Sequence, residues 1–326
     1  MLEQVGSIGN IAVLIVSLAV LIKASSLAIT NSVKLASVTG LGKTKTGFIL
    51  VAFSTSLPEL FVAIFATLNP ENIGISIGNV LGSNIVNICL VLGIGFLIMA
   101  FKYPESVGFF TRMAKDEVGN LNFGIFIASI VPLILLYFRF ANQIVGALLI
   151  VLFAYNMYEL IKKRETVEEI SDEAEKRELG KYLFKSLLGI IGVVISAYFI
   201  VESASFLALS VGIPPVIVGA TVIAFGTSVP ELATSIASIK KGFLDLAIGN
   251  IIGSCFINIT LILGFTLLLA PFEVNISAFS DLIIFSLIAN IILWYILQNT
   301  KVGKREGAIL LTIYVLFLVI SLSSAI

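Results

Sequence analysis

Two glutamates with nearly identical neighbours, Glu59 and Glu231, are the residues of this chain best suited to chemistry. They lie in residues 52–60, Ala-Phe-Ser-Thr-Ser-Leu-Pro-Glu-Leu, and 224–232, Ala-Phe-Gly-Thr-Ser-Val-Pro-Glu-Leu. Both stretches fall inside long apolar segments, and an ionisable side chain at the centre of a bilayer costs about 2.5–3.5 kcal/mol on insertion scales. A structural ion pair is the alternative, but neither glutamate has an obvious lysine or arginine at the same depth. The pair therefore predicts a buried, negatively charged binding site.

Oxygen-bearing groups accompany each glutamate. Pro58 and Pro230 each remove a backbone donor and should open the helix, so that the carbonyls of Ala52 and Ala224 can face a cation. Irregular backbone at this depth is tolerated only where it lines a cavity. Four hydroxyls should join these carbonyls as ligands: Thr55, Ser56, Thr227 and Ser228.

A second pair of matched stretches, residues 78–87 and 249–258, adds further polar groups. Ser83 and Asn87 are four residues apart, as are Ser254 and Asn258, so each pair lies on one helical face. The complete set is all oxygen, which suits hard cations such as Ca²⁺ with typically 6–8 ligands. Two carboxylates would neutralise one Ca²⁺ or two Na⁺. Close packing of small residues would explain the repeated glycines of these stretches, but it would not explain the carboxylates. The glycines are Gly78, Gly82, Gly249 and Gly253.

The composition is that of a polytopic membrane protein. Of 326 residues, 58% are hydrophobic and 12% charged, where a soluble domain has roughly 25% charged residues. The mean hydropathy is +1.10. The first apolar segment lacks the flanks of a signal peptide, and Cys89 and Cys255 are expected to be packed, small core residues. We predict an all-α fold of ten transmembrane helices: about 8–36, 45–68, 73–100, 122–138, 142–162, 182–210, 214–239, 244–270, 277–298 and 305–325.

The matched stretches divide the chain into two halves. At an offset of 172 residues, and of 171 after one slip near Asn69, identities recur far above chance. Each half has five predicted spans, an odd number, so the halves enter the membrane from opposite sides, as in the inverted repeats of transporters. The predicted division is a first repeat over 1–163, an acidic cytoplasmic linker over 164–180 and a second repeat over 181–326.

Basic residues predict the orientation. Eighteen of the 20 lysines and arginines fall in the odd-numbered connections, whereas Arg139 lies in an even-numbered one and Lys23 within the first span. The positive-inside rule makes the odd connections cytoplasmic and both termini extracellular. Lys23 either snorkels to a wet surface or acts as a tethered cation.

Enzymatic function is not expected. The chain has no histidine, which excludes a Ser–His hydrolase, an H-E-x-x-H metalloprotease and a histidine proton relay. The aspartates expected for an acid protease lie in connections or at span ends: Asp116, Asp172, Asp245 and Asp281. No cofactor and no nucleic-acid partner are predicted.

With these residues in view, the chain resembles the calcium/cation antiporter superfamily, specifically a prokaryotic sodium/calcium exchanger. The two paired stretches look like that family's α-repeats, and the ten-span layout fits across nearly the whole chain. The resemblance implies exchange of Ca²⁺ for Na⁺ by alternating access, with spans one and six sliding as a pair. We expect the protein to lie in the cytoplasmic membrane and to function as a monomer. Glu59 and Glu231 would be the shared carboxylates, and the oxygen groups named above the other ligands. Asn258 stands where some relatives carry aspartate, which leaves the formal site charge at −2.

Two other mechanisms remain open. Buried carboxylates can carry protons, so exchange of Ca²⁺ or another divalent cation for H⁺ is the first alternative. A passive cation channel is the second, although channels usually need a pore built from a ring of repeats. Tracer flux against separate Na⁺, K⁺ and H⁺ gradients distinguishes the three.

Overall fold

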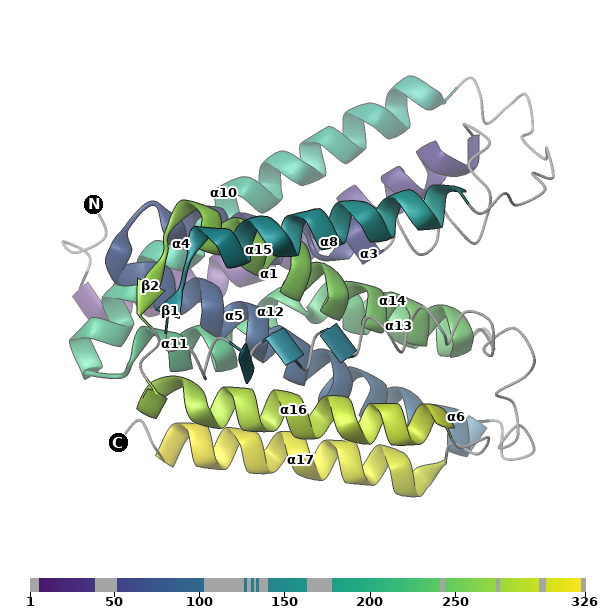
Figure 1. Ribbon diagram of the computed structural model, residues 1–326. Helices are drawn as coiled ribbons and strands as arrows, with labels where there is room; N and C mark the ends of the chain where they lie inside the picture. The colour runs from purple at the N-terminus through teal and green to yellow at the C-terminus, as the bar shows by residue number, and fades with distance from the viewer. Residues whose placement is uncertain are drawn as a thin grey trace.

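The protein is a bundle of helices that run roughly along one long axis (Figure 1). The computed structural model describes residues 6–38, 52–102, 126–127, 130–131, 133–134, 140–162, 178–240, 244–273, 276–298 and 303–323. These residues are almost entirely helical. Two short strands, β1 (Phe140–Ala141) and β2 (Phe272–Glu273), pair antiparallel at one end of the bundle. The first described helix begins and the last one ends at that same end (Figure 1).

Six helical stretches are long and apolar enough to cross a membrane, and a bent helix pair makes a possible seventh. Their positions match predicted spans one, three, six, eight, nine and ten, and the bent pair matches span seven. Predicted spans 45–68 and 122–138 and most of the linker extend outside the described residues, so the count of ten helices stays a prediction. The six stretches are Gly6–Asn31, Pro70–Lys102, Leu179–Val211, Ala247–Leu269, Phe279–Ile296 and Lys304–Ser323.

Two spans form the centre of the bundle. One consists of α5 (Ile73–Ile85), the π-helical turn η4 (Val86–Leu92) and α6 (Gly93–Lys102), and follows the 3₁₀ turn η3 (Pro70–Asn72). Its counterpart consists of α14 (Leu244–Ile257), the π-helical turn η7 (Asn258–Ile262) and α15 (Leu263–Leu269). Of the 18 residues in the most apolar stretch of each span, 67% are buried in the first of these two and 83% in its counterpart. The corresponding value for the span at Gly6–Asn31 is 28%. Helices buried on all sides can carry polar groups away from lipid, which places the second pair of matched stretches in the interior.

The helices that carry the glutamates are broken, as the prolines predict. In the first half α3 (Ala52–Thr55) stops at Ser56, and α4 (Leu57–Thr67) begins beyond it. In the second half α11 (Pro215–Val218), the π-helical turn η6 (Gly219–Ile223) and α12 (Ala224–Thr227) stop at Ser228, before α13 (Val229–Lys240). The axis turns by 42° at this second break. Both serines have ψ near 0°, so the two matched stretches bend at the same place.

A long helix pair flanks this centre. Helix α1 (Gly6–Val38) packs along α10 (Leu179–Val211). Gly189 and Gly192 of α10 lie against Ala24 of α1, where a side chain would leave no room. Lys23, one residue before, is not buried and does not enter the site.

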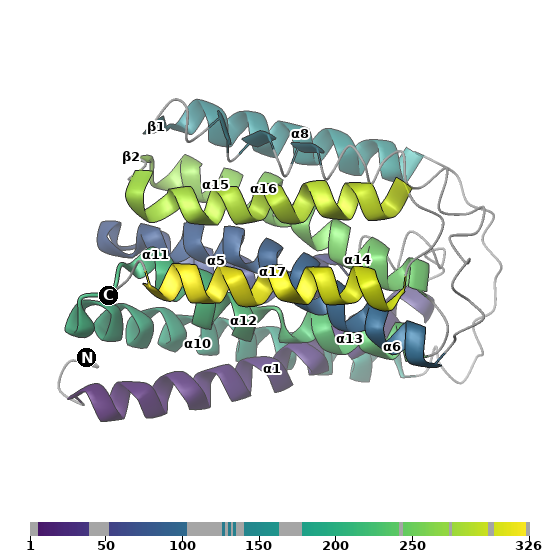
Figure 2. The ribbon, with the colours of Figure 1, turned by 90° about the horizontal axis from the view of Figure 1, so that it is seen from below.

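The remaining helices cover the other sides. Helix α8 (Gln143–Lys162) packs on α15, on the side of the bundle opposite α1 (Figure 2). Helices α16 (Ile276–Gln298) and α17 (Lys304–Ser323) form a hairpin that packs against α5, η4 and α6. The aromatic rings of Phe285 and Phe317 meet edge to face across this hairpin, with centroids 5.6 Å apart.

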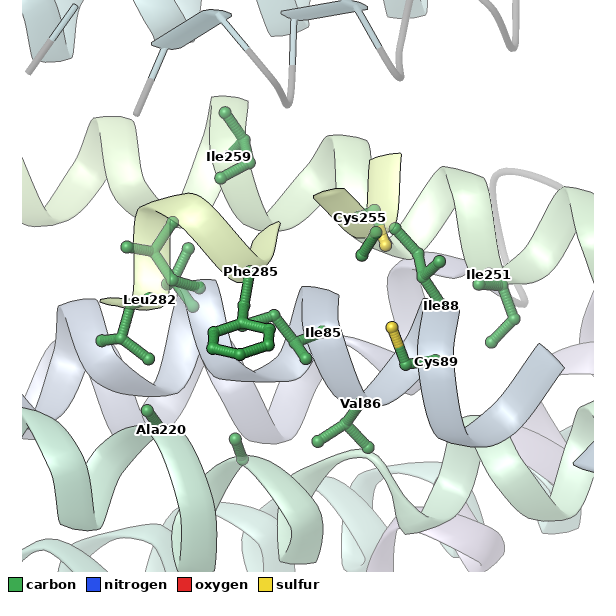
Figure 3. Packing of buried hydrophobic residues seen from close by; sticks show 14 of the residues in the cluster. Ile85, Val86, Ile88, Cys89, Ala220, Ile251, Cys255, Ile259, Leu282 and Phe285 are labelled. Atoms are coloured by element: carbon green, nitrogen blue, oxygen red, sulfur yellow. The ribbon is translucent and has the colours of Figure 1, made fainter. Parts of the chain in front are cut away.

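Both cysteines are buried and free, as predicted from the sequence. Cys89 in η4 and Cys255 in α14 lie in the core where the two central spans meet, among Ile85, Ile88 and Ile251 (Figure 3).

Glycines of the second matched stretch allow a very close contact between helices. A methyl group on Gly78 would overlap the carbonyl oxygen of Val216, and one on Gly82 would overlap that of Ala220. Helix α5 thus touches the backbone of α11 and η6, which brings the two halves of the chain together beside the breaks.

We predict that Gly82→Ala destabilises the protein strongly. The new methyl group would collide with backbone atoms, which cannot rotate away, and such overpacking costs about 1–3 kcal/mol. Gly180→Ala is the matched control, because a methyl group there would meet no atom within 4 Å and the residue sits in the first turn of α10. Thermal unfolding in detergent should show a clearly lower midpoint for Gly82→Ala alone. Equal midpoints for the two variants would contradict the close helix contact.

Candidate cation-binding site

Glu59 and Glu231 are completely buried, with 0% of each residue exposed. Each lies in the first turn of the helix that follows a break, α4 or α13, where the helix dipole favours a negative charge. The two carboxylates interact electrostatically. Within the described ranges, the ion pair that the structure contains joins Lys181 to Glu178 at the surface, and neither buried glutamate has a basic partner. This agrees with the expectation that neither glutamate is paired with a lysine or arginine.

One serine from each central span contacts one glutamate. Ser254 Oγ donates to Glu231 Oε1 at 3.0 Å, and Ser83 Oγ lies 3.5 Å from Glu59 Oε1. The second oxygen of each carboxylate, Oε2, has no hydrogen-bond partner in the part of the chain that the structure describes. Each carboxylate therefore keeps one oxygen available for a cation.

Hydroxyls from the opposite half complete the cluster. Ser56 Oγ lies 2.7 Å from Ser254 Oγ, and Thr227 Oγ1 lies 3.4 Å from Ser83 Oγ. Ser228 is buried, and its hydroxyl has no partner among the described residues. Each glutamate thus has beside it a pair of hydroxyls drawn from both halves, Ser254 with Ser56 at Glu231 and Ser83 with Thr227 at Glu59.

The two predicted amides lie at the π-helical turns of the central spans. Asn258 begins η7, and its Nδ2 donates to Asn84 Oδ1 at 3.1 Å, which leaves its own Oδ1 unpartnered in the described chain. Asn87 lies in η4, is completely buried, and has no hydrogen bond from either amide atom to a described residue. Single π-helical turns occur frequently at functional sites, because they displace side chains from the regular helical rows.

The break does not free the Ala224 carbonyl, and the roles of Ala52 and Ala224 as ligands stay predictions. The Ala224 oxygen accepts the Ser228 N–H at 3.1 Å and the Thr227 hydroxyl at 3.3 Å. Proline removes the bond to the carbonyl four residues earlier, so the carbonyl that Pro230 deprives of its helical donor is that of Gly226. Ala52 begins α3 on the equivalent turn of the first half.

Two asparagines that the sequence analysis did not single out contact threonines of the site. Thr227 Oγ1 lies 3.1 Å from Asn79 Oδ1, and Thr55 Oγ1 lies 3.5 Å from Asn250 Oδ1. Both asparagines follow the first glycine of the second matched stretch, and this identity between the halves was the signal that could have found them.

The arrangement can hold a hard cation. No group of three or more histidine, cysteine, aspartate or glutamate side chains occurs among the residues whose placement is described. Neutral oxygens must therefore complete the shell around the two carboxylates. Such a ligand set selects Ca²⁺ or Na⁺ over soft transition metals.

The chain is similar to known exchangers over nearly its whole length. The chain is 29% identical over 352 aligned positions to sodium/calcium exchanger MaX1 of Methanosarcina acetivorans, covering 95% of this chain and 98% of MaX1. Structures of the sodium–calcium exchanger NCX_Mj superpose with a TM-score of 0.67 at 25% identity, over 95% of this chain and 98% of the other. The H⁺/Ca²⁺ exchanger CAX shares the fold, with a TM-score of 0.74 at 16% identity over 97% and 87% of the two chains.

The family profile covers both halves. The sodium/calcium exchanger protein family matches residues 9–162 and 181–323, which together include both glutamates and both pairs of matched stretches. The chain belongs to the sodium/calcium exchanger protein family.

Proposed function

We propose that this protein is a secondary active antiporter that exchanges Ca²⁺ for Na⁺ across the cytoplasmic membrane. The observation that carries the proposal is the pair of fully buried carboxylates, one from each half, each beside hydroxyls from both halves and without a basic partner in the described chain. Their combined charge of −2 matches one Ca²⁺ or two Na⁺. The names of the relative MaX1 and of NCX_Mj support the same ion pair.

Electrostatics explains why exchange should be obligatory. An uncompensated charge in a low-dielectric interior costs several kcal/mol, so an empty site carrying two bare carboxylates should rarely cross between its two access states. A site neutralised by Ca²⁺ or Na⁺ avoids this cost. The two ions therefore take turns at one cluster, and the inverted halves supply two related states, one open to each side.

The first test neutralises each carboxylate. Glu59→Gln and Glu231→Gln keep the side-chain volume but halve the site charge, and each should reduce Na⁺-driven ⁴⁵Ca²⁺ uptake into vesicles by at least about 100-fold. Glu71→Gln is the matched control, because Glu71 is exposed in η3, and it should transport like the unmodified protein. Uptake that ignores the Na⁺ gradient, or that survives in both site variants, would falsify the proposed antiport.

Proton-coupled exchange is the second candidate. Two protons would neutralise two carboxylates as two Na⁺ do, and the fold is shared with CAX. The discriminating measurement is Ca²⁺ uptake driven by a pH gradient in vesicles free of Na⁺. We expect uptake near the background of Glu231→Gln. Uptake equal to the Na⁺-driven rate would favour H⁺ as the coupling ion.

We also propose that the protein works as a monomer, with both termini outside the cell and the odd-numbered connections in the cytoplasm. Lys240 and Glu71, exposed at the ends of helical segments, report on opposite faces in this topology. A membrane-impermeant maleimide added to intact cells should label Glu71→Cys and spare Lys240→Cys until the cells are opened. The reverse pattern would invert the proposed orientation.

A further inference from the structure

Each threonine of the site faces an amide oxygen that comes from the other half of the chain. Thr227 of α12 contacts Asn79 of α5, and Thr55 of α3 contacts Asn250 of α14, with oxygen–oxygen distances of 3.1 Å and 3.5 Å. Asn79 and Asn250 occupy equivalent positions, as do Thr55 and Thr227. All four residues are at least 97% buried. The same contact is therefore built twice, once on each side of the site.

Each threonine also interacts with a glutamate of the opposite half, Thr227 with Glu59 and Thr55 with Glu231. Thr227 Oγ1 lies 3.4 Å from Ser83 Oγ, which itself lies 3.5 Å from Glu59 Oε1. A hydroxyl has one proton and two lone pairs. When a cation lies against the carboxylate, the hydroxyl can act as its ligand only if its proton points away from the ion. The proton then needs another acceptor. For Thr227 the amide oxygen of Asn79, at 3.1 Å, lies nearer than the alternative acceptor, the Ala224 carbonyl oxygen at 3.3 Å.

We propose that Asn79 and Asn250 are positioning residues of the cation site, each of which accepts the proton of a threonine hydroxyl and so turns the hydroxyl's lone pairs toward the ion. This inference rests on the proposed function for the identity of the ion. Each of these hydrogen bonds also links the two halves of the chain, because the amide lies in one half and the threonine in the other. Loss of either amide should weaken cation binding without touching a carboxylate.

The two halves differ in how the asparagine itself is held. Asn250 Nδ2 lies 3.2 Å from Thr234 Oγ1 and 3.5 Å from Ser235 Oγ, so two hydroxyls fix its amide with the oxygen toward Thr55. The equivalent residues of the first half are Val62 and Ala63, which offer no side-chain acceptor. Accordingly, Asn79 Nδ2 has no partner among the described residues. Thr227 is the hydroxyl partner that orients Asn79. This pair is better suited to the test, because replacing Asn79 breaks no hydrogen bond from its Nδ2 to another described residue.

The test is a double-mutant cycle read by equilibrium ⁴⁵Ca²⁺ binding to the purified protein in detergent. Asn79→Leu removes the acceptor at similar volume, and Thr227→Val removes the hydroxyl. Each single change should weaken Ca²⁺ binding by about 10-fold, the effect of one hydrogen bond. The double variant should bind no more weakly than Thr227→Val, because Asn79 acts through this hydroxyl. As the control pair, Asn79→Leu with Thr55→Val should weaken binding by the product of the two single effects.

The positioning role would be overturned if the double variant of Asn79→Leu and Thr227→Val weakened Ca²⁺ binding by the product of the two single effects. It would also be overturned if Asn79→Leu alone left Ca²⁺ binding unchanged. If Asn79→Leu does not fold, as judged by its thermal midpoint, the cycle of Asn250→Leu and Thr55→Val replaces it with the same expected result. A wild-type protein that binds Ca²⁺ but shows no Na⁺-driven uptake would overturn the proposed antiport and leave the cycle readable. A wild-type protein that binds no Ca²⁺ would overturn both.

Discussion

Two carboxylates held close together in a dry interior repel one another, and each has also lost its hydration. Here Glu59 and Glu231 are both fully buried and interact electrostatically, with no lysine or arginine beside them in the described chain. An isolated buried charge of this kind costs several kcal/mol unless it is compensated. The rest of the bundle provides groups that lower this cost in part, and a bound cation must supply the remainder.

Several features of the fold serve this purpose. The breaks at Ser56 and Ser228 place each glutamate in the first turn of a helix, where the backbone N–H groups and the helix dipole favour negative charge. Gly78 and Gly82 let α5 touch the backbone of α11 and η6, so a central span of the first half packs directly on the broken helix of the second. The π-helical turns η4 and η7 carry Asn87 and Asn258 into the same interior. These arrangements use neutral dipoles, which can stabilise a carboxylate without replacing the cation.

Much of this site could be predicted from the sequence, because the duplication marks it twice. Glu59 and Glu231, with Ser83 and Ser254, recur at nearly constant spacing, and the prolines indicate where the helices break. The hydrogen bonds between the halves could not be predicted, since spacing along one helix does not say which residue of another helix lies opposite. Departures from symmetry were hidden for the same reason. Ser254 is bonded to Ser56, whereas its equivalent Ser83 lies beside Thr227.

The fold was predictable to a similar extent. Apolar segments and charge distribution identify long spans, and six of them are present with nearly the predicted limits. The hydrogen bonds of the Ala224 carbonyl could not be predicted. The sequence shows that Pro230 removes a donor, but the carbonyl that loses it depends on the register of the hydrogen bonds around the break. Asn79 and Asn250 were overlooked because we attributed the neighbouring glycines to close helix packing. Packing alone does not require an amide at these positions, so the repeated asparagines called for a separate explanation.

The central claim is that the two buried carboxylates share one cation. Crystals grown with Sr²⁺, a heavier divalent ion, allow its position to be measured by anomalous scattering. The prediction is one strong peak bridging the carboxylates of Glu59 and Glu231, which disappears when the crystals are transferred to high Na⁺. A peak elsewhere, or carboxylates bound to a lysine or arginine with no ion between them, would contradict it.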